Sequence, residues 1–154
     1  MTNIAIVGAD GRKWTENDPE LVKYIIRHIL TKYDNPTLIS GHCPLGGVDL
    51  WAEEVAKELQ IPMRIFKPKQ NAWKFYKQRN IQIAEFCDVL YDIEPLKSCR
   101  FCGGLGVRGE KTCSFCEGDG AYSGGTWTLK YAKTLGKEVW KIIVSVRTYV
   151  EGLE

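Results

Sequence analysis

The chain has 154 residues, of which 44% are hydrophobic, so it can bury one substantial core but is too short for two ordinary domains. Its 21 basic and 19 acidic side chains give a formal net charge of +2, which excludes a global field that recruits nucleic acid or anionic membranes. Any anion site must be local. No apolar run approaches the roughly 20 residues that span a bilayer, and an apolar strand pattern follows Met1 almost at once. We therefore expect a cytoplasmic protein with no signal peptide and no membrane partner.

Short apolar runs typical of buried strands alternate with segments of helical periodicity along most of the chain. The expected strands are residues 4–8, 37–40, 63–66, 88–93 and 139–144. The expected helices are residues 19–33 with Asp18 as N-cap, residues 48–59, residues 71–87, and a last helix bearing Leu129, Ala132 and Leu135. This alternation predicts an α/β fold, a Rossmann-like three-layer arrangement with a mostly parallel sheet of about five strands. Residues 145–154 fit neither pattern.

The alternation breaks after the fourth strand, where residues 94–122 are rich in Gly and Cys and have no sustained period. We predict one domain over residues 1–154 with a small inserted loop at residues 95–122. Ligands of parallel sheets bind at the carboxyl ends of the strands, around the point where strand order reverses. Every loop that follows a strand is therefore a candidate part of a site.

Two CxxC pairs in the insertion, Cys99 with Cys102 and Cys113 with Cys116, predict one structural zinc ion. Four thiolates favour tetrahedral zinc, and four protein ligands leave no open position for catalysis. Disulfides, a redox-active CxxC and an iron centre are the alternatives, but duplicated CxxC spacing in a reducing compartment favours a metal site. Cys43 and Cys87 remain as free thiols.

The insertion reads CxxCxGxG, six residues, then CxxCxGxG, and over about 22 residues it resembles the cysteine-rich repeats of DnaJ-type chaperones. That family uses four such repeats to hold two zinc ions, so the two repeats here imply one ion. The resemblance leaves open whether both pairs meet within one chain or across a dimer. It does not extend to substrate-protein binding or thiol chemistry.

Two strand-to-helix loops are suited to an anion such as phosphate. Residues 40–49 (SGHCPLGGVD) join a strand to a helix start, where free N–H groups and the helix dipole favour negative charge. Alone, such glycines are more often simple turns. Residues 123–126 (SGGT) open the last helix in the same way and add hydroxyl donors. Two such helix starts at one sheet edge suggest a nucleotide ligand.

An ordered set of segments resembles the SLOG superfamily, Rossmann-like domains that include the Lonely Guy hydrolases and DNA-processing protein A, and above all its short YspA-type branch. The matching pieces are IAIVG near the start, SGHCPLGGVDLWAEEVAKELQIP, the Arg79-Asn80 pair, Cys87-Asp88, and SGGTWTLKYAKTLGK. They span nearly the whole chain apart from residues 94–122. The resemblance implies a pocket for a nucleotide or nucleotide-derived ligand and, since related domains commonly self-associate, a homodimer as a candidate assembly. The candidate ligand-binding residues are Gly8, Asp10, Arg12, Ser40, Gly41, Gly46, Gly47, Asp49, Arg79, Asn80, Ser123, Gly124, Gly125 and Thr126.

Several of these side chains also have purely structural interpretations. Asp49 could orient a ribose hydroxyl or simply favour the helix dipole. Arg79 and Asn80 lie in a polar stretch that would ordinarily be a solvated helix face, and only the resemblance places them in a site. Arg12 and Lys13 could close over a phosphate or decorate a loop, and His42 is better explained as a turn residue than as a base. Trp14, Trp73 and Trp127 could stack on a base, although tryptophan more often packs in a core.

Three functions compete. Binding or sensing of a nucleotide-like ligand leads, with the base between the first loop and the zinc insertion. A phosphoribohydrolase resembling Lonely Guy is the second, with Arg79 as the matching arginine. The glutamate that follows the PGGxGT loop in that family is missing here, so Asp10, Asp49, Asp92 or Glu94 would have to replace it. The third is a nucleic-acid binder resembling DNA-processing protein A, with Arg100, Arg108 and Lys111 adding positive charge.

Overall fold

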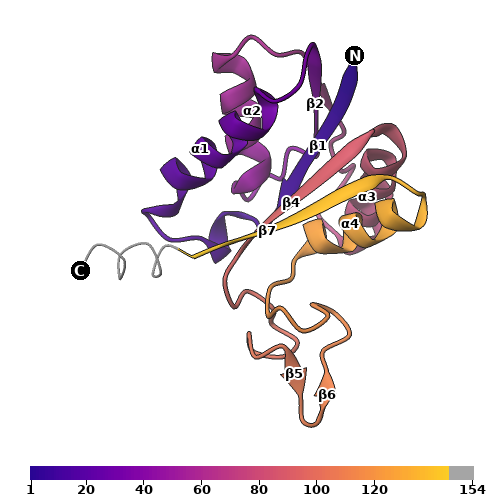
Figure 1. Ribbon diagram of the computed structural model, residues 1–154. Coiled ribbons are helices and arrows are strands. Elements are labelled where there is room, and N and C mark those ends of the chain that lie inside the picture. The colour runs from indigo at the N-terminus through magenta and orange to yellow at the C-terminus, as the bar shows by residue number, and fades with distance from the viewer. Residues whose placement is uncertain (146–154) are drawn as a thin grey trace.

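A five-stranded parallel sheet forms the centre of the computed structural model, which describes residues 1–145 (Figure 1). Its strands are β1 (Thr2–Gly8), β2 (Pro36–Ser40), β3 (Met63–Ile65), β4 (Val89–Pro95) and β7 (Glu138–Val144). They are ordered β3-β2-β1-β4-β7, and every neighbouring pair is parallel. The predicted Rossmann-like arrangement is confirmed.

Two helices cover each face of the sheet, which gives three layers (Figure 1). The helices are α1 (Asp18–Leu30), α2 (Val48–Glu58), α3 (Trp73–Phe86) and α4 (Gly124–Thr134). Alternation of side chains along each strand divides the core in two. Ile4 and Ile6 of β1 pack in the cluster shared with α1 and α2, whereas Ala5 and Val7 pack in the cluster shared with α3 and α4.

The strand order reverses at β1, which pairs with β2 on one side and with β4 on the other. After β1 the chain enters the layer of α1 and α2. After β4 it passes through residues 96–123 and enters the opposite layer, that of α3 and α4, at α4. In such sheets a crevice opens between the loops that follow these two strands. Gly8 and Ile93 are register partners at this edge, so both loops start from the same place.

Element ends differ from the predictions by a few residues, for local reasons. Helix α1 ends at Leu30 rather than near Tyr33. Asp18 is not its N-cap, because its carboxylate accepts the N–H of Thr15 at 2.5 Å and Asp18 itself lies inside the helix. Strand β4 continues to Pro95, since it pairs with β7 as far as Val144.

The insertion projects from the carboxyl edge of the sheet as a separate lobe (Figure 1). It follows β4, contains the short antiparallel strands β5 (Val107–Arg108) and β6 (Lys111–Thr112), and returns directly into α4. Within residues 1–145, no helix is both long and apolar enough to cross a membrane. The tail, residues 146–154, lies outside the described residues.

Candidate functional site

The four cysteines of the insertion converge within one chain. Their sulfur atoms all lie within 4.8 Å of one another, and all four side chains are buried. Cys99 Sγ lies 3.9 Å from Cys113 Sγ, and Cys102 Sγ lies 3.7 Å from Cys116 Sγ. A tetrahedral site with Zn–S bonds of about 2.3 Å separates its sulfurs by about 3.8 Å, whereas a disulfide would need roughly 2.05 Å. The cluster therefore fits a metal ion.

The two CxxCxGxG repeats form equivalent halves of the insertion. Gly106 N–H donates to Cys102 Sγ at 3.2 Å, and Gly120 N–H donates to Cys116 Sγ at 3.3 Å, the same contact at the same offset in each repeat. Against the cost of burial, the Gly106 donor and the neighbouring thiols lower the pKa of Cys102 to about 7. These donors stabilise thiolate sulfur, which is the form that binds a metal.

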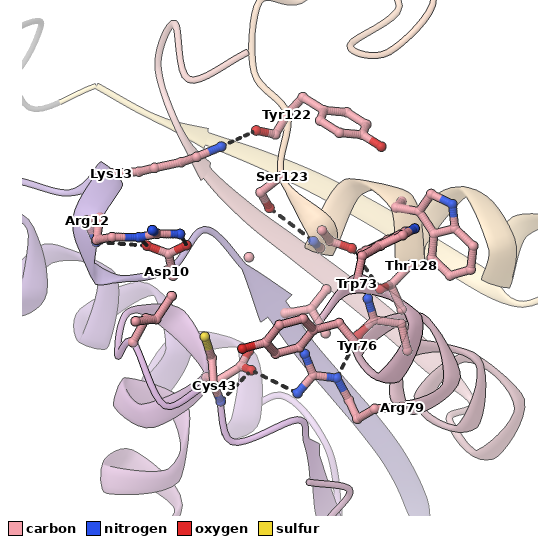
Figure 2. Close-up of a pocket in the computed structure, with 18 of the residues that line it drawn as sticks. Asp10, Arg12, Lys13, Cys43, Trp73, Tyr76, Arg79, Tyr122, Ser123 and Thr128 are labelled. Carbon is pink, nitrogen blue, oxygen red and sulfur yellow. Dashed lines mark hydrogen bonds and ion pairs between the residues drawn. The ribbon is translucent and has the colours of Figure 1, made fainter. Parts of the chain in front are cut away.

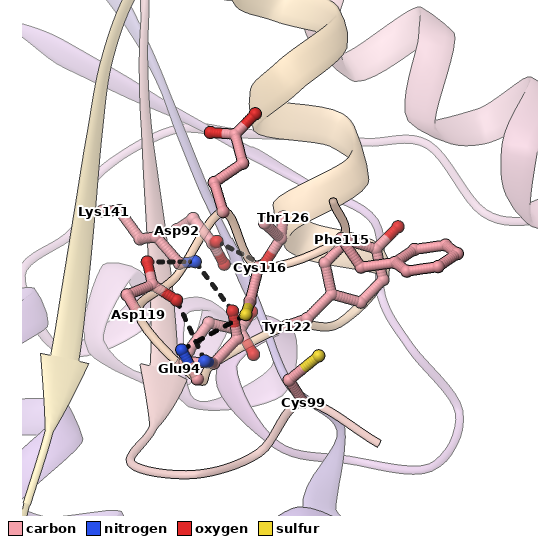
Figure 3. A network of polar contacts seen from close by, with 12 residues as sticks. Asp92, Glu94, Cys99, Phe115, Cys116, Asp119, Tyr122, Thr126 and Lys141 are labelled. Carbon is pink, nitrogen blue, oxygen red and sulfur yellow. Dashed lines mark hydrogen bonds and ion pairs between the residues drawn. The ribbon is translucent and has the colours of Figure 1, made fainter. Parts of the chain in front are cut away.

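The second residue between the cysteines of each pair is a phenylalanine. These two residues, Phe101 and Phe115, stack on one another with their ring centroids 3.6 Å apart. The ring of Tyr122 meets both of them edge-on. The lobe is also attached to the sheet domain by lysines. Lys130 of α4 donates to Ser114 O and Phe115 O, and Lys141 of β7 pairs with Asp119 at 2.7 Å (Figure 3). The aromatic side of the lobe is thereby held against the edge of the sheet.

A cavity of about 580 Å³ opens at this edge, between the loops after β1 and β4 and the starts of α2, α3 and α4 (Figure 2). Its size lies within the range of roughly 300–1,000 Å³ typical of small-molecule sites. Arg100, Phe101, Phe115 and Tyr122 line it, so the insertion supplies one wall. Trp73, Tyr76 and Trp127, from α3 and α4, supply an aromatic wall of their own.

The start of α2 is occupied by the protein's own carboxylate. Asp49, in the first turn, accepts the N–H of Cys43 at 3.1 Å and lies 4.0 Å from Arg79 Nη1. Burial raises the pKa of Asp49 to about 6, although Arg79 and the Cys43 N–H favour its charged form. Both side chains are over nine-tenths buried and line the cavity.

Arg79 is fixed from several sides. Its Nη1 donates to the carbonyl of Gly41, and its Nε donates to Asn80 Oδ1 at 2.7 Å. Its guanidinium also lies over the ring of Tyr76. A Cβ on Gly41 would collide with the guanidinium, so this glycine admits the arginine. The polar stretch that contains Arg79 and Asn80 is therefore not a solvated helix face at these two positions.

The start of α4 carries no acidic residue in its first turn. Ser123 and Thr126 form a reciprocal capping box, in which Ser123 Oγ accepts the N–H of Gly125 and Thr126 Oγ1 accepts the N–H of Ser123. Gly124 is exposed and lines the cavity. The dipole of this helix favours a negative group at Gly124, although the capping box already uses the N–H groups of Ser123 and Gly125.

Asp92 and Glu94 lie behind the start of α4 rather than in the cavity (Figure 3). Both are fully buried on one face of β4. Asp92 Oδ2 accepts from Thr126 Oγ1 at 2.8 Å, and Glu94 Oε2 accepts from Ser123 Oγ at 2.5 Å. Their remaining oxygens have no other partner among the described residues. Burial, together with the neighbouring charge of Asp92, raises the pKa of Glu94 well above its usual range.

The loop after β1 brings two cations to the cavity with different surroundings. Arg12 is paired with Asp10, whose carboxylate oxygens accept from the Arg12 side chain at 3.0 and 3.1 Å. Lys13 Nζ donates to the carbonyl of Tyr122 at 2.9 Å and thus bridges this loop to the end of the insertion (Figure 2). Lys13 makes no ion pair among residues 1–145, so its charge remains available to an anion.

The structure brings most of the predicted ligand-binding residues to one cavity. Those that line it are Gly8, Asp10, Arg12, Asp49, Arg79, Asn80, Ser123, Gly124 and Gly125. Ser40, Gly41, Gly46, Gly47 and Thr126 do not line it. Ser40 instead donates to Glu53 at 2.8 Å, and Gly47 packs against the backbone after β1.

The sequence predicted that the insertion borders the site, but the prediction did not name the insertion's own aromatic side chains. Arg100, Phe101, Phe115 and Tyr122 line the cavity, and an aromatic residue inside each CxxC pair was the available signal. Of the tryptophans that were considered, Trp73 and Trp127 line the cavity, whereas Trp14 packs in the core against Trp51. No acidic partner was expected for His42, yet its Nδ1 lies 2.8 Å from Glu53. Its backbone has the left-handed φ of a turn residue, and it does not line the cavity.

Comparison with known proteins adds no relative. No protein-family model matches the chain, and no curated protein gives a significant match. The geometry of the cavity and of the cysteine cluster is therefore the basis for a functional conclusion.

Proposed function

We propose that the protein binds or senses a nucleotide or nucleotide-derived ligand in the cavity at the carboxyl edge of the sheet. The observation that carries this proposal is the contrast between two helix starts in the same cavity: Asp49, a buried carboxylate, lines it at α2, whereas at α4 the exposed Gly124 lines it and the nearby acids Asp92 and Glu94 do not. Burying Asp49 costs free energy, and a destabilising polar group that lines a cavity is typical of a binding site. The strand order and the position of these residues also support membership of the SLOG superfamily.

The cavity suggests how such a ligand would lie. Its phosphate would take the start of α4, close to Gly124 and within reach of Lys13, because the helix dipole and the lysine charge favour an anion there. Its sugar hydroxyls would donate to Asp49 and accept from Asn80. Its base would then stack among the aromatic side chains of the walls, such as Trp73.

We further propose that the metal in the insertion is a single structural zinc ion. Four thiolate ligands and sulfur separations near those of a zinc tetrahedron support this choice of metal. Because the insertion forms one wall of the cavity, the ion would hold Phe101, Phe115 and Tyr122 in place for the ligand.

Native mass spectrometry of the purified full chain tests both parts together, since it reads metal stoichiometry, oligomeric state and any retained small molecule. We expect one zinc ion per chain and a bound nucleotide-like mass. Titration calorimetry with nucleoside mono-, di- and triphosphates and dinucleotides then gives the affinities. If the folded, zinc-loaded protein binds none of these compounds at millimolar concentration, the proposed function is wrong.

Asp49 favours a second candidate, a nucleoside-monophosphate phosphoribohydrolase. The reaction consumes water and a nucleoside monophosphate and yields free base and ribose 5-phosphate. A carboxylate near the sugar stabilises positive charge that develops as the glycosidic bond breaks, and Asp49 lies in the cavity beside Arg79. Release of free base that is abolished in Asp49→Asn would support hydrolysis. Tight binding with no base released from any common nucleotide would leave binding alone.

A further inference from the structure

The charges of the molecule are distributed unevenly between its two helical layers. No Asp or Glu occurs between Glu58 and Glu85, or between Asp119 and Glu138, and these two segments contain β3, α4 and all of α3 that precedes Glu85. The layer of α1 and α2 contains most acids that pair with cations, such as Glu54 with Lys23 and Glu58 with Arg27. A net charge of +2 thus conceals a strongly basic face.

Four exposed lysines between Glu58 and Glu85 are free of ion pairs among residues 1–145. Lys67 and Lys69 follow β3 at the carboxyl edge of the sheet, and Lys74 and Lys77 lie on α3. On the α4 side, Lys130 binds carbonyl groups of the insertion and Lys137 binds the carbonyl of Glu85, whereas Lys133 is also exposed and makes no ion pair among the described residues. The four free lysines lie within one segment that has no acid, and Lys74 and Lys77 flank Trp73 and Tyr76, which line the cavity.

Aromatic side chains run through the same face. Trp73 of α3 is 51% exposed and meets Trp127 of α4 edge-on, with ring centroids 5.5 Å apart. Trp127 in turn stacks with Tyr131, and Lys77 lies over the Trp127 ring. The row passes from the mouth of the cavity along α4, since Trp73 and Trp127 both line the cavity. Burial in a core does not account for a tryptophan as exposed as Trp73.

We infer that this face binds a single-stranded nucleic acid, with one nucleotide of the strand in the cavity. Aromatic side chains beside a basic surface are the combination that such proteins use, because bases stack on the rings while lysines contact the phosphates. A duplex keeps its bases stacked inside and could not use Trp73. The part of the inference that concerns the cavity rests on the proposed function, whereas the surface itself does not.

Fluorescence anisotropy with a labelled single strand of about 12 nucleotides tests the inference on the zinc-loaded full chain, with DNA and RNA of one sequence compared. If the four lysines each contact a phosphate, log Kd should change with log salt concentration with a slope of magnitude about 3. A duplex of the same sequence should bind at least about tenfold more weakly.

Matched variants test whether binding of the strand depends on this face or on surface charge in general. Lys74→Glu with Lys77→Glu, and separately Trp73→Ala, should each weaken binding about tenfold or more. The controls Lys57→Glu on α2 and Trp140→Ala on β7 change an exposed lysine and a 54% exposed tryptophan elsewhere, and they should change Kd less than about twofold.

Three outcomes would overturn the inference. These are no binding of the single strand, an equal loss of affinity in the control variants, and equally tight binding of anionic vesicles that is also lost in Lys74→Glu with Lys77→Glu. If the strand binds as expected but no free nucleotide binds or competes with it, the surface stands and the proposed cavity ligand fails. If a free nucleotide binds and the strand does not, the proposed cavity ligand stands and the nucleic-acid surface fails.

Discussion

The starts of α2 and α4 border one cavity but differ in what occupies them. Both follow glycine-containing loops at the carboxyl edge of the sheet. At α2 the first turn contains Asp49, which is buried and faces Arg79. At α4 the first turn has no acid, and Gly124 is exposed to the cavity. The carboxylate at α2 lines the cavity and repels a second anion there, whereas the acids behind α4, Asp92 and Glu94, do not line it. The two loops are therefore not equivalent phosphate sites.

This difference predicts how a ligand would be oriented in the cavity. Negative charge from a ligand is favoured at α4, and hydrogen-bond donors from a ligand are favoured at Asp49. The end of the insertion leads directly into Ser123, so the start of α4 depends on the cysteine-rich insertion, whereas the start of α2 depends only on the sheet domain. Four experiments separate the two ends of the cavity.

Removal of the metal should have the largest effect, and it should act on the α4 side. Structural zinc contributes about 10 kcal/mol or more to folding in small zinc peptides, and the insertion has little apolar core besides its cysteines and Phe101, Phe115 and Tyr122. Chelation should therefore abolish protection of amide hydrogens from exchange in the insertion, while β1 stays protected. Ligand affinity should fall at the same time.

The same loss should follow from Cys102→Ser, whereas Cys87→Ala, a buried thiol outside the cluster, should keep full metal stoichiometry. Unchanged ligand affinity in a metal-free but folded protein would show that the insertion is not a wall of the binding site.

Asp49→Asn should stabilise the protein at neutral pH by up to about 3 kcal/mol. The raised pKa means that folded Asp49 takes up a proton below about pH 6 more readily than unfolded Asp49. Its contribution to stability is therefore present at pH 4 and is lost as the pH rises to about 6. Urea unfolding of both proteins should give a difference near zero at low pH that grows toward neutrality. A constant difference across this range would mean that Asp49 is not the titrating group.

Gly124→Asp should make the start of α4 resemble that of α2. A side chain fits there, because a Cβ on Gly124 would approach only Asn80 Nδ2, at 3.9 Å. The new carboxylate should weaken binding of a phosphate-bearing ligand by about tenfold or more and leave binding of an uncharged nucleoside unchanged. Calorimetry on both compounds measures the contrast, and the neutral variant Gly124→Asn is the control. Equal losses for both compounds would place the phosphate elsewhere.

Lys13→Met should have the smallest effect, because Lys13 lies at the rim of the cavity. Loss of one partly solvated cation should weaken binding of a phosphate-bearing ligand by about threefold and reduce its dependence on salt. Lys57→Met, which changes an exposed lysine on α2, should have no effect. A loss that persists at high salt would indicate that Lys13 matters for its bond to Tyr122 rather than for its charge.

The strand and helix order and the cysteine cluster could be predicted because each depends on local patterns. Period-two and helical spacing mark the elements, and CxxC spacing constrains four thiolates without knowledge of the fold. The different states of the two helix starts could not be predicted, because burial of Asp49 depends on Arg79, which comes from a distant helix. The same long-range contact hid the burial of Arg79 and Asn80 within a polar segment.

Two further features of the site can be recognised in the sequence alone. The absence of acidic residues between Glu58 and Glu85 can be read without a structure, although total net charge conceals it. The aromatic residues within the CxxC pairs, Phe101 and Phe115, can also be read, but their role in a cavity wall required the position of the insertion relative to α3.

The floor of the cavity consists largely of main chain. A Cβ on Gly125 would lie 2.6 Å from Gly8 N and 2.8 Å from Asp92 Oδ1, so α4 rests directly on the end of β1 with no side chain between them. Backbone in such contact has no rotamers to exchange, so the floor offers every ligand one fixed surface. Adaptation to different ligands must then come from the walls. We expect changes of specificity, whether evolved or engineered, to arise at Trp73 and in the cysteine-rich insertion.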